Sequence, residues 1–433
     1  MRPSALLFAL TVALAPVGAP REAGAQPLPT ADAAAEGFSA DRLATLRARM
    51  ARVVSEGQHG GLITLVARNG RIVDVQTFGH RDREQQLPMA RDTIVRIYSM
   101  SKVVTSVAAL TLVEEGRLGL DDPVAQYLPA LGTLKIFSGG TADAPTLVPA
   151  TRPMTVRHLL THTSGFVYGF GRDAIDTVYQ RAGFFQAPTL DAFVEIAARM
   201  PLVHEPGTRF RYGISTDILG AVVEKAAGQP FAEVIRSRIT EPLRMHDTGF
   251  TVPADKRARL AKVYTTDKSG ALTAMPVAGV GEADEIPYPD EAGRGFPSGG
   301  GGLFSTIDDY ARFGQMLLNG GELDGVRVLG RKTVESMWSN HLVHLDPPTL
   351  DSSRSEGFGL GGSVRLDLAS GAPLGSIGQF GWSGAATTYF NIDPQEGTLA
   401  LLFTQHMPFN QHGVFETFST LMYAALIDPP RRP

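Results

Sequence analysis

Residues 97–104 read Ile-Tyr-Ser-Met-Ser-Lys-Val-Val and open a predicted helix. Ser99 and Lys102 lie three positions apart, so on a helix they share one face and come within side-chain reach of each other. The helix continues with Gly116 as its C-terminal cap, and apolar residues recur at helical spacing: Val103, Val107 and Leu110. The stretch therefore presents a hydroxyl and an amine together at the start of a helix.

This Ser-x-x-Lys pattern has two interpretations. A serine hydroxyl becomes a nucleophile when a neighbouring group takes its proton, and a partly desolvated lysine such as Lys102 can contribute to that. Alternatively, Ser99 caps the helix while Lys102 points to water. A two-residue pattern occurs by chance often enough that the rest of the chain has to decide between them.

Composition narrows the classes of protein. The chain has 433 residues, of which 43% are hydrophobic, which is enough for a large core. The formal net charge is −4, and no long run of one sign offers a surface for nucleic acid or an anionic membrane. Because the chain has no cysteine, disulfides, thiolate metal sites and cysteine nucleophiles are excluded.

Residues 1–25 have the features of a cleavable signal peptide. Arg2 supplies a positive charge, residues 5–17 are apolar, and residues 23–25 read Ala-Gly-Ala before Gln26. The apolar stretch is too short for a permanent membrane span, and no later stretch of about 20 apolar residues follows. We therefore expect a periplasmic or secreted protein, cut after Ala25, with one mature domain over residues 26–433 and no stable membrane insertion.

The mature chain is predicted to begin with a helix and a hairpin. Ser39 can cap a helix with one apolar face, made by Leu43, Leu46, Met50 and Val53. Two β-rich runs, 62–68 and 71–78, flank the pair Asn69-Gly70. That arrangement predicts a β-hairpin with a type I′ turn.

Helices and loops are expected in the middle of the chain. A short helix is predicted over 154–160, and Thr306 with Asp309 forms a capping box for another that ends at residues 319–321. Residues 130–153 and 276–302 are rich in Gly and Pro or other small residues and are expected to form surface loops.

Strands return in the final third of the chain, at 358–366, 387–392 and 398–404, before a last helix at about 415–426. Strands at both ends with helices between them favour an α+β fold: an antiparallel β-sheet flanked by helices, with a mostly helical second lobe. We expect the α/β lobe to comprise about 36–95 and 300–428, and the helical lobe about 99–295.

Three further stretches are candidates for a functional site. Tyr212 stands at a predicted loop-to-helix turn, where it either points into a cleft as a general base or packs with its hydroxyl on backbone. Residues 380–385 read Phe-Gly-Trp-Ser-Gly-Ala, which is either a backbone approach to a ligand or a tight turn around a core Trp382. His162 is a weaker candidate, because a histidine at a helix end is often a capping or packing group.

Taken in order, these motifs resemble those of the serine β-lactamase and penicillin-binding-protein superfamily: Ser99, Lys102, Tyr212 and Trp382-Ser383-Gly384. Residues 159–165, Leu-Leu-Thr-His-Thr-Ser-Gly, and residues 301–309 look like marks of its class C-like branch. The resemblance spans about residues 36–428. Within the branch, the chain looks most similar to the family VIII carboxylesterases. It implies a serine β-lactamase-like fold.

Two departures from the class C β-lactamase pattern bear on the substrate. Ile214 stands where an asparagine would bind a substrate amide, and its side chain makes no hydrogen bonds. Trp382 stands where a lysine would attract a carboxylate, and it offers an apolar wall with a single N–H donor. A pocket without that cation favours neutral esters over anionic lactams.

The resemblance implies a serine hydrolase that cleaves carboxylic esters of small neutral substrates through an acyl-enzyme. Ser99 attacks the carbonyl, and Lys102 and Tyr212 share its activation, with the general base left open between them. Tyr212 is the favoured proton donor to the leaving alcohol. The backbone N–H groups of Ser99 and Ala385 are the expected oxyanion hole.

The substrate is expected to contact Trp382, Ser383, Gly384 and Ile214. The expected partner is a small-molecule ester or lactam. No cofactor and no metal are expected, and no His-x-x-x-His pair is expected to hold zinc. The chain has no Gly-x-Ser-x-Gly pentapeptide, which argues against an α/β-hydrolase. The alternatives are a β-lactamase, a D-amino-acid peptidase or transacylase of the same fold, and a ligand-binding relative without catalysis.

Overall fold

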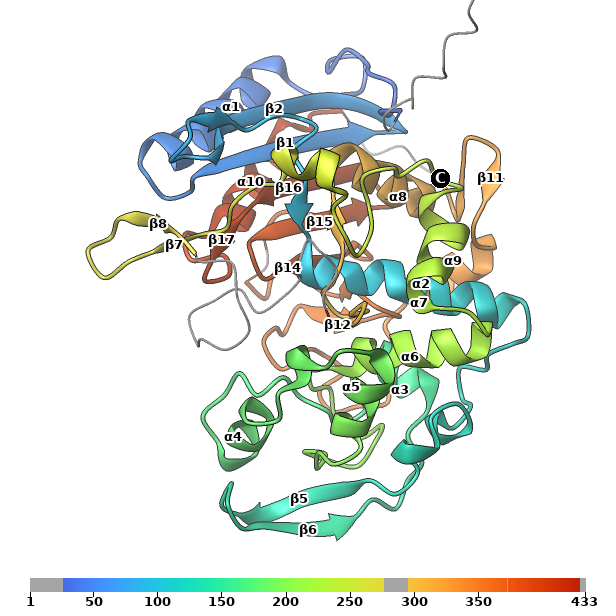
Figure 1. Cartoon of the computed structure of the whole chain (residues 1–433). Coiled ribbons are helices and arrows are strands. Elements are labelled where there is room, and N and C mark those ends of the chain that lie inside the picture. The colour runs from blue at the N-terminus through green and yellow to red at the C-terminus, as the bar shows by residue number, and fades with distance from the viewer. Residues whose placement is uncertain (1–25, 276–294, 372, 429–433) are drawn as a thin grey trace, which may run out of the picture.

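The computed structural model describes residues 26–275, 295–371 and 373–428 (Figure 1). The predicted signal peptide and most of the predicted loop at 276–302 lie outside the described residues. Among the helices of these described ranges, none is long and apolar enough to cross a membrane.

An eight-stranded antiparallel sheet has the strand order β12-β13-β14-β15-β16-β1-β2-β3. Its strands are β1 (Gly61–Arg68), β2 (Arg71–Asp82), β3 (Leu87–Pro88), β12 (Glu356–Phe358), β13 (Ser363–Arg365), β14 (Phe380–Gly384), β15 (Thr388–Asp393) and β16 (Thr398–Thr404). The first and last parts of the chain meet where β1 pairs with β16, with Val66 opposite Ala400. The prediction that both ends of the chain share one antiparallel sheet is confirmed.

The predicted hairpin is present between β1 and β2. Asn69 and Gly70 both have positive φ, 51° and 79°, as a type I′ turn requires. All eight residues of β1 are buried, because β1 lies inside the sheet and is covered on both faces.

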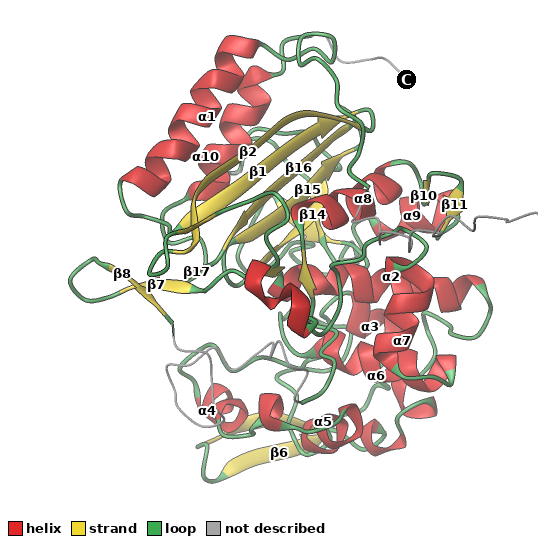
Figure 2. Ribbon diagram, turned by 45° about the horizontal axis from the view of Figure 1, so that its top comes forward, coloured by secondary structure: helices red, strands yellow, loops and turns green. Residues whose placement is uncertain are grey.

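Helices cover both faces of the sheet (Figure 2). Helix α1 (Ala40–Ser55) and helix α10 (Val414–Ala425) share a core with one face, and the predicted apolar stripe of α1 is fully buried there. Ser39 caps α1 by accepting a hydrogen bond from the backbone N–H of Arg42. On the opposite face, Tyr310 of α8 (Ile307–Leu318) lies 5.1 Å from the ring of Phe390 on β15.

The remaining helices belong mostly to the second lobe: α2 (Ser101–Glu114), α3 (Val156–Leu160), α4 (Ala174–Gln180), α5 (Leu190–Ala197), α6 (Ser215–Ala227), α7 (Phe231–Ile235) and α9 (Arg331–Met337). Helix α2 lies between the sheet and α6 (Figure 1), and every residue from Ser101 to Leu112 is buried. A helix that is buried on all sides in this way is a fixed platform for the residues at its start.

Short strands complete the described structure: β4 (Val95–Arg96), β5 (Lys135–Gly140), β6 (Pro145–Pro149), β7 (Tyr264–Thr266), β8 (Leu272–Ala274), β9 (Phe304–Ser305), β10 (Glu322–Leu323), β11 (Val326–Arg327) and β17 (His406–Met407). The pair β5 and β6 corrects the prediction of a surface loop at 130–153. The Gly and Pro residues of this stretch lower its apparent β propensity, but two short runs in it pair as an exposed hairpin.

Two boundaries also differ from the predictions. The run 358–366 is two strands, β12 and β13, because Gly361 with φ 100° makes a tight turn between them. The helix predicted over 154–160 begins at Val156, since Thr155 has extended backbone and accepts from the N–H of His158 as the N-cap.

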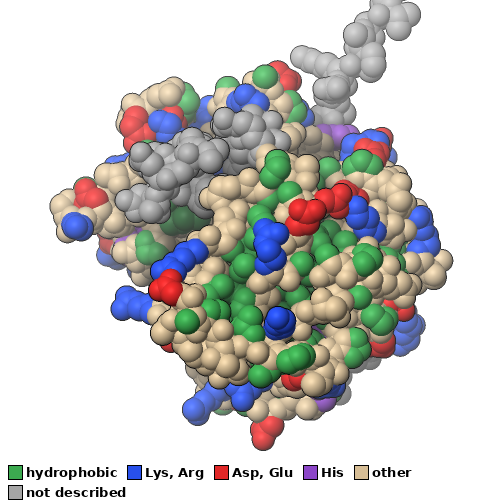
Figure 3. Space-filling model, turned by 60° about the horizontal axis from the view of Figure 1, so that its bottom comes forward, with side chains coloured by type: hydrophobic (Ala, Val, Ile, Leu, Met, Phe, Trp, Pro, Cys, Tyr) green, Lys and Arg blue, Asp and Glu red, His purple; other side chains and the backbone are tan. Residues whose placement is uncertain are grey.

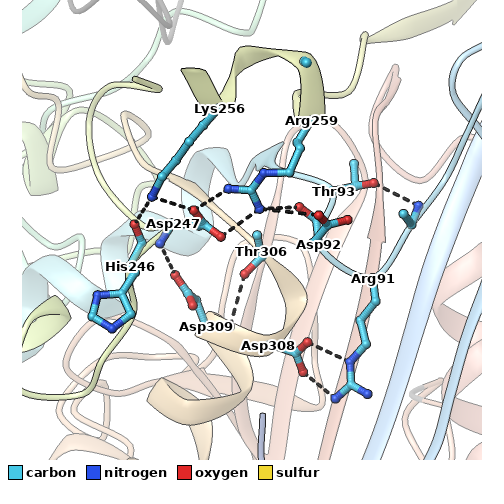
Figure 4. A network of polar contacts seen from close by, with 12 residues as sticks. Arg91, Asp92, Thr93, His246, Asp247, Lys256, Arg259, Thr306, Asp308 and Asp309 are labelled. Carbon is cyan, nitrogen blue, oxygen red and sulfur yellow. Dashed lines mark hydrogen bonds and ion pairs between the residues drawn. The ribbon is translucent and has the colours of Figure 1, made fainter. Parts of the chain in front are cut away.

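The start of α8 is held by a polar network, shown in Figure 4. Arg91 binds Asp308 at 2.6 Å, and Arg259 and Lys256 bind Asp247 at 2.6 and 2.9 Å. The first pair ties the segment before β4 to the first turn of α8, and the other two pairs join residues within the segment after α7.

Asp309 carries the fully buried carboxylate of this network. As predicted, its backbone N–H is capped by Thr306, but its carboxylate does not complete a capping box. Instead its Oδ2 accepts from the backbone N–H of Asp247 at 2.8 Å and from Thr248 Oγ1 at 2.9 Å, and its Oδ1 has no hydrogen-bond partner. Burial, with the charges of Asp247 and Asp308, raises the pKa of Asp309 to about 7.

We predict that Asp309→Asn becomes more favourable to stability, relative to wild type, as the pH rises. The folded state holds the proton of Asp309 more tightly than the unfolded chain, whose ordinary pKa is 3.8. The wild-type protein therefore loses stability from this group between about pH 4 and pH 7, and asparagine, which stays neutral, does not. The measurement is the Tm of both proteins from pH 4.5 to pH 8.

The Tm difference, variant minus wild type, should become more positive across this range. Asp308→Asn is the matched control, because it removes the ion pair with Arg91 and should lower the Tm. A Tm difference for Asp309→Asn that does not change with pH would contradict the prediction.

Candidate active site

Ser99 lies in a single 3-10 turn, Tyr98–Met100, that runs directly into α2. Tyr98 has φ 43°, a left-handed conformation that costs a non-glycine residue roughly 1–3 kcal/mol. The half-buried Ser99 side chain lines a cleft of about 1150 Å³. A strained turn at the start of a buried helix thus presents the hydroxyl to the cleft.

The structure brings Ser99 together with Lys102 and Tyr212, as the sequence predicts. Tyr212 Oη donates a hydrogen bond to Ser99 Oγ at 2.7 Å, and Lys102 Nζ donates to the same oxygen at 3.1 Å. Lys102 comes from the first turn of α2, whereas Tyr212 comes from the loop just before α6. The first turn of α2 and the loop before α6 therefore supply the groups that contact the hydroxyl.

Lys102 is fully buried, and each of its three possible N–H donors has an acceptor. Besides Ser99, Lys102 Nζ donates to Tyr168 Oη at 3.0 Å and to the backbone carbonyl of Gly300 at 2.6 Å. The nitrogen also lies 5.2 and 4.7 Å from the ring centres of Tyr168 and Tyr212. A buried cation would be stabilised by these contacts.

Trp382 lies on strand β14 itself, which rules out the tight turn that was one of the two interpretations of this stretch. It pairs with Phe390 of β15. Its indole Nε1 donates to Tyr212 Oη at 3.3 Å, and the two ring centres are 5.4 Å apart. The indole N–H of Trp382 is therefore hydrogen-bonded to Tyr212 in this structure.

Strand β14 passes very close to the turn that carries Ser99. A Cβ added at Gly384 would lie closer than 3.0 Å to the backbone carbonyl of Ile97 and to Thr388 Oγ1. Only glycine permits this approach. Beyond it, Ala385, the predicted second oxyanion donor, lines the same cleft as Ser99, together with Ser383.

His162 and Ile214 lie behind the cleft. The His162 ring is fully buried, 4.8 Å from the ring centre of Tyr212, and accepts from the backbone N–H of Gly213 at 3.3 Å. Burial, with the nearby charge of Lys102, lowers its pKa well below the ordinary value, so it is a neutral packing group. Ile214 is fully buried in the core and is not one of the residues that line the cleft.

The sequence contains one His-x-x-x-His pair, His158 and His162, which the prediction of no zinc site left out of account. His158 Nδ1 accepts from the backbone N–H of Thr155, and the His162 nitrogens face Gly213 and Thr216. Within the described ranges, no group of three or more His, Cys, Asp or Glu side chains is arranged to hold a metal ion.

The cleft is largely aromatic near Ser99. Tyr168 stacks on Phe170 with ring centres 4.9 Å apart, and Phe170 is 80% exposed at the cleft surface. Most charged lining residues come from the region of β12 and β13, where Arg354 is exposed and Arg365 donates to a backbone carbonyl; Glu416 comes from α10. On the face shown in Figure 3, hydrophobic side chains gather in the central hollow with single basic groups between them.

Two residues near Lys102, Asp217 and Tyr168, were not predicted from the sequence. Asp217 is fully buried in the first turn of α6 and accepts hydrogen bonds from Ser298 Oγ and the Gly300 N–H. Burial raises its pKa, and the charge of Lys102 acts in the opposite direction. An acidic residue directly before the apolar run Ile218-Leu219 was the signal that could have identified it.

We predict that Gly384→Ala slows the reaction of Ser99 with a fluorophosphonate by about 100-fold or more, the scale of losing one oxyanion donor. The added methyl group must push β14 away from Ile97 and so move the backbone of Ala385 relative to Ser99. Gly249→Ala is the matched control, because its Cβ would meet only one atom at an ordinary 3.8 Å. Equal labelling rates in both variants would contradict this account.

Comparison with known proteins agrees with this geometry. A family model described as Beta-lactamase matches residues 44–421. An uncharacterised protein of Mycobacterium tuberculosis is 37% identical over 372 residues, covering 84% of this chain and 90% of that protein. Esterase EstB of Burkholderia gladioli is 34% identical over 298 residues, covering 64% of this chain and 70% of the esterase.

Solved structures give the same result. EstCE1, described as a hydrolase with promiscuous acyltransferase activity, superposes with a TM-score of 0.75 at 28% identity, over 88% of this chain and 99% of that chain. Simvastatin synthase (LovD) from Aspergillus terreus superposes with a TM-score of 0.75 at 26% identity, over 89% and 99%. With its antiparallel sheet, its helical lobe and its Ser-x-x-Lys helix between them, the chain belongs to the β-lactamase family.

Proposed function

We propose that this protein is a serine hydrolase that cleaves carboxylic esters of small neutral substrates through an acyl-enzyme on Ser99. The observation that carries the proposal is the convergence of Tyr212 Oη and Lys102 Nζ on Ser99 Oγ, at 2.7 and 3.1 Å, in an open cleft. The similarity to EstB and EstCE1, which are described as an esterase and a hydrolase, supports it.

In the acylation step, Ser99 Oγ attacks the ester carbonyl carbon while its proton passes to the Lys102–Tyr212 pair. The carbonyl oxygen becomes an oxyanion, and we assign the backbone N–H groups of Ser99 and Ala385 to bind it, each worth roughly 3 kcal/mol of barrier. The tetrahedral intermediate then collapses. The C–O bond to the alcohol breaks, and Tyr212 returns the proton to the leaving oxygen.

Deacylation repeats these steps with water. Water attacks the acyl carbon, the same pair takes its proton, and the proton returns to Ser99 Oγ as the acid leaves. The hydrogen bond from Trp382 Nε1 to Tyr212 Oη directs the tyrosine hydroxyl toward Ser99 in both steps.

Preference for esters over β-lactams follows from the third motif. Trp382 brings an aromatic wall and a donor already engaged with Tyr212, so this position offers no cation for a lactam carboxylate. Lys102, the amine that contacts Ser99, is fully buried and hydrogen-bonded to three acceptors.

Acyl transfer to an alcohol or amine is the second candidate function. A cleft of about 1150 Å³ has room for an acceptor beside the acyl group. Similarity to EstCE1, a hydrolase with promiscuous acyltransferase activity, and to methylbutanoyltransferases from Penicillium citrinum and Aspergillus terreus favours this candidate. Product analysis with an added alcohol separates the two: an ester product indicates transfer, and acid alone indicates hydrolysis.

We predict that the purified protein hydrolyses a short-chain p-nitrophenyl ester at least tenfold faster, in kcat/KM, than a chromogenic cephalosporin, a difference of about 1.4 kcal/mol in barrier. Both substrates are measured side by side with Ser99→Ala as the control, which should abolish turnover. Cephalosporin turnover equal to the ester rate would favour a β-lactamase, and activity that survives in Ser99→Ala would overturn the assignment of the nucleophile.

We predict that Tyr212→Phe lowers kcat by about 10²–10⁴-fold, the usual contribution of a general acid–base group. Phenylalanine keeps the ring contacts with Trp382 and His162, so the Tm should change little. Tyr127→Phe is the matched control, because that hydroxyl binds Asp122 at 2.7 Å, outside the cleft. A kcat for Tyr212→Phe within a few-fold of wild type would remove the tyrosine from the mechanism.

A further inference from the structure

Residues 298–302, Ser-Gly-Gly-Gly-Gly, form a glycine strap between helices α2 and α6. On the α2 side, Thr105 Oγ1 donates to the Gly299 carbonyl at 2.8 Å. On the α6 side, a Cβ added at Gly299 would lie closer than 3.0 Å to the carbonyl of Thr216. The strap therefore fits between the two helices because it has no side chains there.

Asp217 holds this glycine strap from the α6 side. Its Oδ1 accepts from Ser298 Oγ and from the backbone N–H of Gly300, the latter at 3.1 Å. A Cβ added at Gly300 would lie closer than 3.0 Å to both carboxylate oxygens and to Cγ. The carboxylate and the strap are thus in direct contact, with the carboxylate fully buried.

The same carboxylate contacts one of the three acceptors around Lys102, the Tyr168 hydroxyl, and it binds the N–H of Gly300, the residue that carries another. The Gly300 carbonyl, on the residue whose N–H Asp217 binds, accepts from Lys102 Nζ at 2.6 Å. Tyr168 Oη lies between the two charged groups, 3.0 Å from Lys102 Nζ and 3.4 Å from Asp217 Oδ2. One hydroxyl therefore separates the carboxylate from the amine that contacts Ser99.

We propose that Asp217 is a positioning residue for the acyl-enzyme reaction: it fixes the Gly300 carbonyl and the Tyr168 hydroxyl against Lys102 and supplies the counter-charge for the ammonium. The proposal rests on the proposed function. When the bond from Ser99 Oγ to the carbonyl carbon forms, the proton of Ser99 moves to the Lys102–Tyr212 pair, and a neutral Lys102 amine that takes it becomes an ammonium. The positive charge created there faces the Asp217 carboxylate across Tyr168, and it disappears when the proton leaves with the alcohol.

A purely structural carboxylate would explain the burial but not the arrangement. An acidic residue in the first turn of a helix is favoured by the helix dipole wherever the helix lies. Asp217, however, directs its oxygens at the strap and at Tyr168, which are the groups that hold Lys102. Among the residues that the structure describes, Tyr212 and the neutral His162 are further titratable groups facing this pair.

The test is Asp217→Asn, which keeps the shape of the side chain and removes its charge. We expect kcat for the p-nitrophenyl ester to fall about 10–100-fold with KM changed less than threefold, since the substrate does not contact Asp217. We also expect the acid limb of the kcat/KM profile to move to lower pH by half a unit or more. Without the carboxylate, the activating pair is less readily protonated, so it stays active in more acidic solution.

Asp309→Asn is the matched control. Asp309 is also fully buried, in the same position of the first turn of α8, but its carboxylate binds Asp247 and Thr248 and none of the groups around Lys102. That variant should leave kcat and the pH profile unchanged. A pH profile for Asp217→Asn that matches wild type would overturn the proposal.

Two further measurements keep the proposal testable in every case. If Asp217→Asn does not fold, Tyr168→Phe removes the hydroxyl between the charges and should move the acid limb in the same direction; no movement overturns the proposal. Labelling of Ser99 by a fluorophosphonate, measured against pH, reports its activation without any ester substrate. Labelling without ester turnover would reject the proposed function, while the effect of Asp217→Asn on the labelling profile still decides the role of Asp217.

Discussion

The buried amine of Lys102 is the constraint on which the rest of the site depends. A buried amine or ammonium costs free energy unless its N–H groups meet acceptors, and here three segments supply them: Ser99 from the turn before α2, Tyr168 from the loop before α4, and the Gly300 carbonyl. Two of these acceptors, Ser99 and Gly300, are 201 positions apart in the sequence. The fold has to bring these three segments together so that the buried amine of Lys102 has its acceptors.

This constraint explains two groups of glycines. Backbone must approach Lys102 and Ser99 more closely than side chains permit, and Gly300 and Gly384 are the positions where a Cβ would collide with Asp217 and with Ile97. Gly300 lies on the side of the cleft formed by the helical lobe, and Gly384 lies on strand β14 of the sheet. The site is therefore assembled where the sheet and the helices meet, with glycine at both contacts.

Local patterns predicted what local geometry determines. The i, i+3 spacing of Ser99 and Lys102, the Asn69-Gly70 turn and the stripe of α1 could all be read from the sequence because each depends on neighbouring residues. Strand β14 was missed because Gly381 and Gly384 lower its apparent β propensity, although pairing with β13 and β15 fixes it. The contacts of Asp217 were beyond local reasoning, since its hydrogen-bond partners lie 49 to 83 positions away.

The third motif combines specificity and positioning in a single side chain. Trp382 Nε1 donates to Tyr212 Oη, and this leaves the tyrosine hydroxyl proton to be donated to Ser99 Oγ. A lysine at position 382 could also donate to the tyrosine, but it would add a charge that attracts anionic substrates. Tryptophan keeps the donor and replaces the charge with an aromatic wall, so orientation of Tyr212 and preference for neutral acyl groups follow from the same residue.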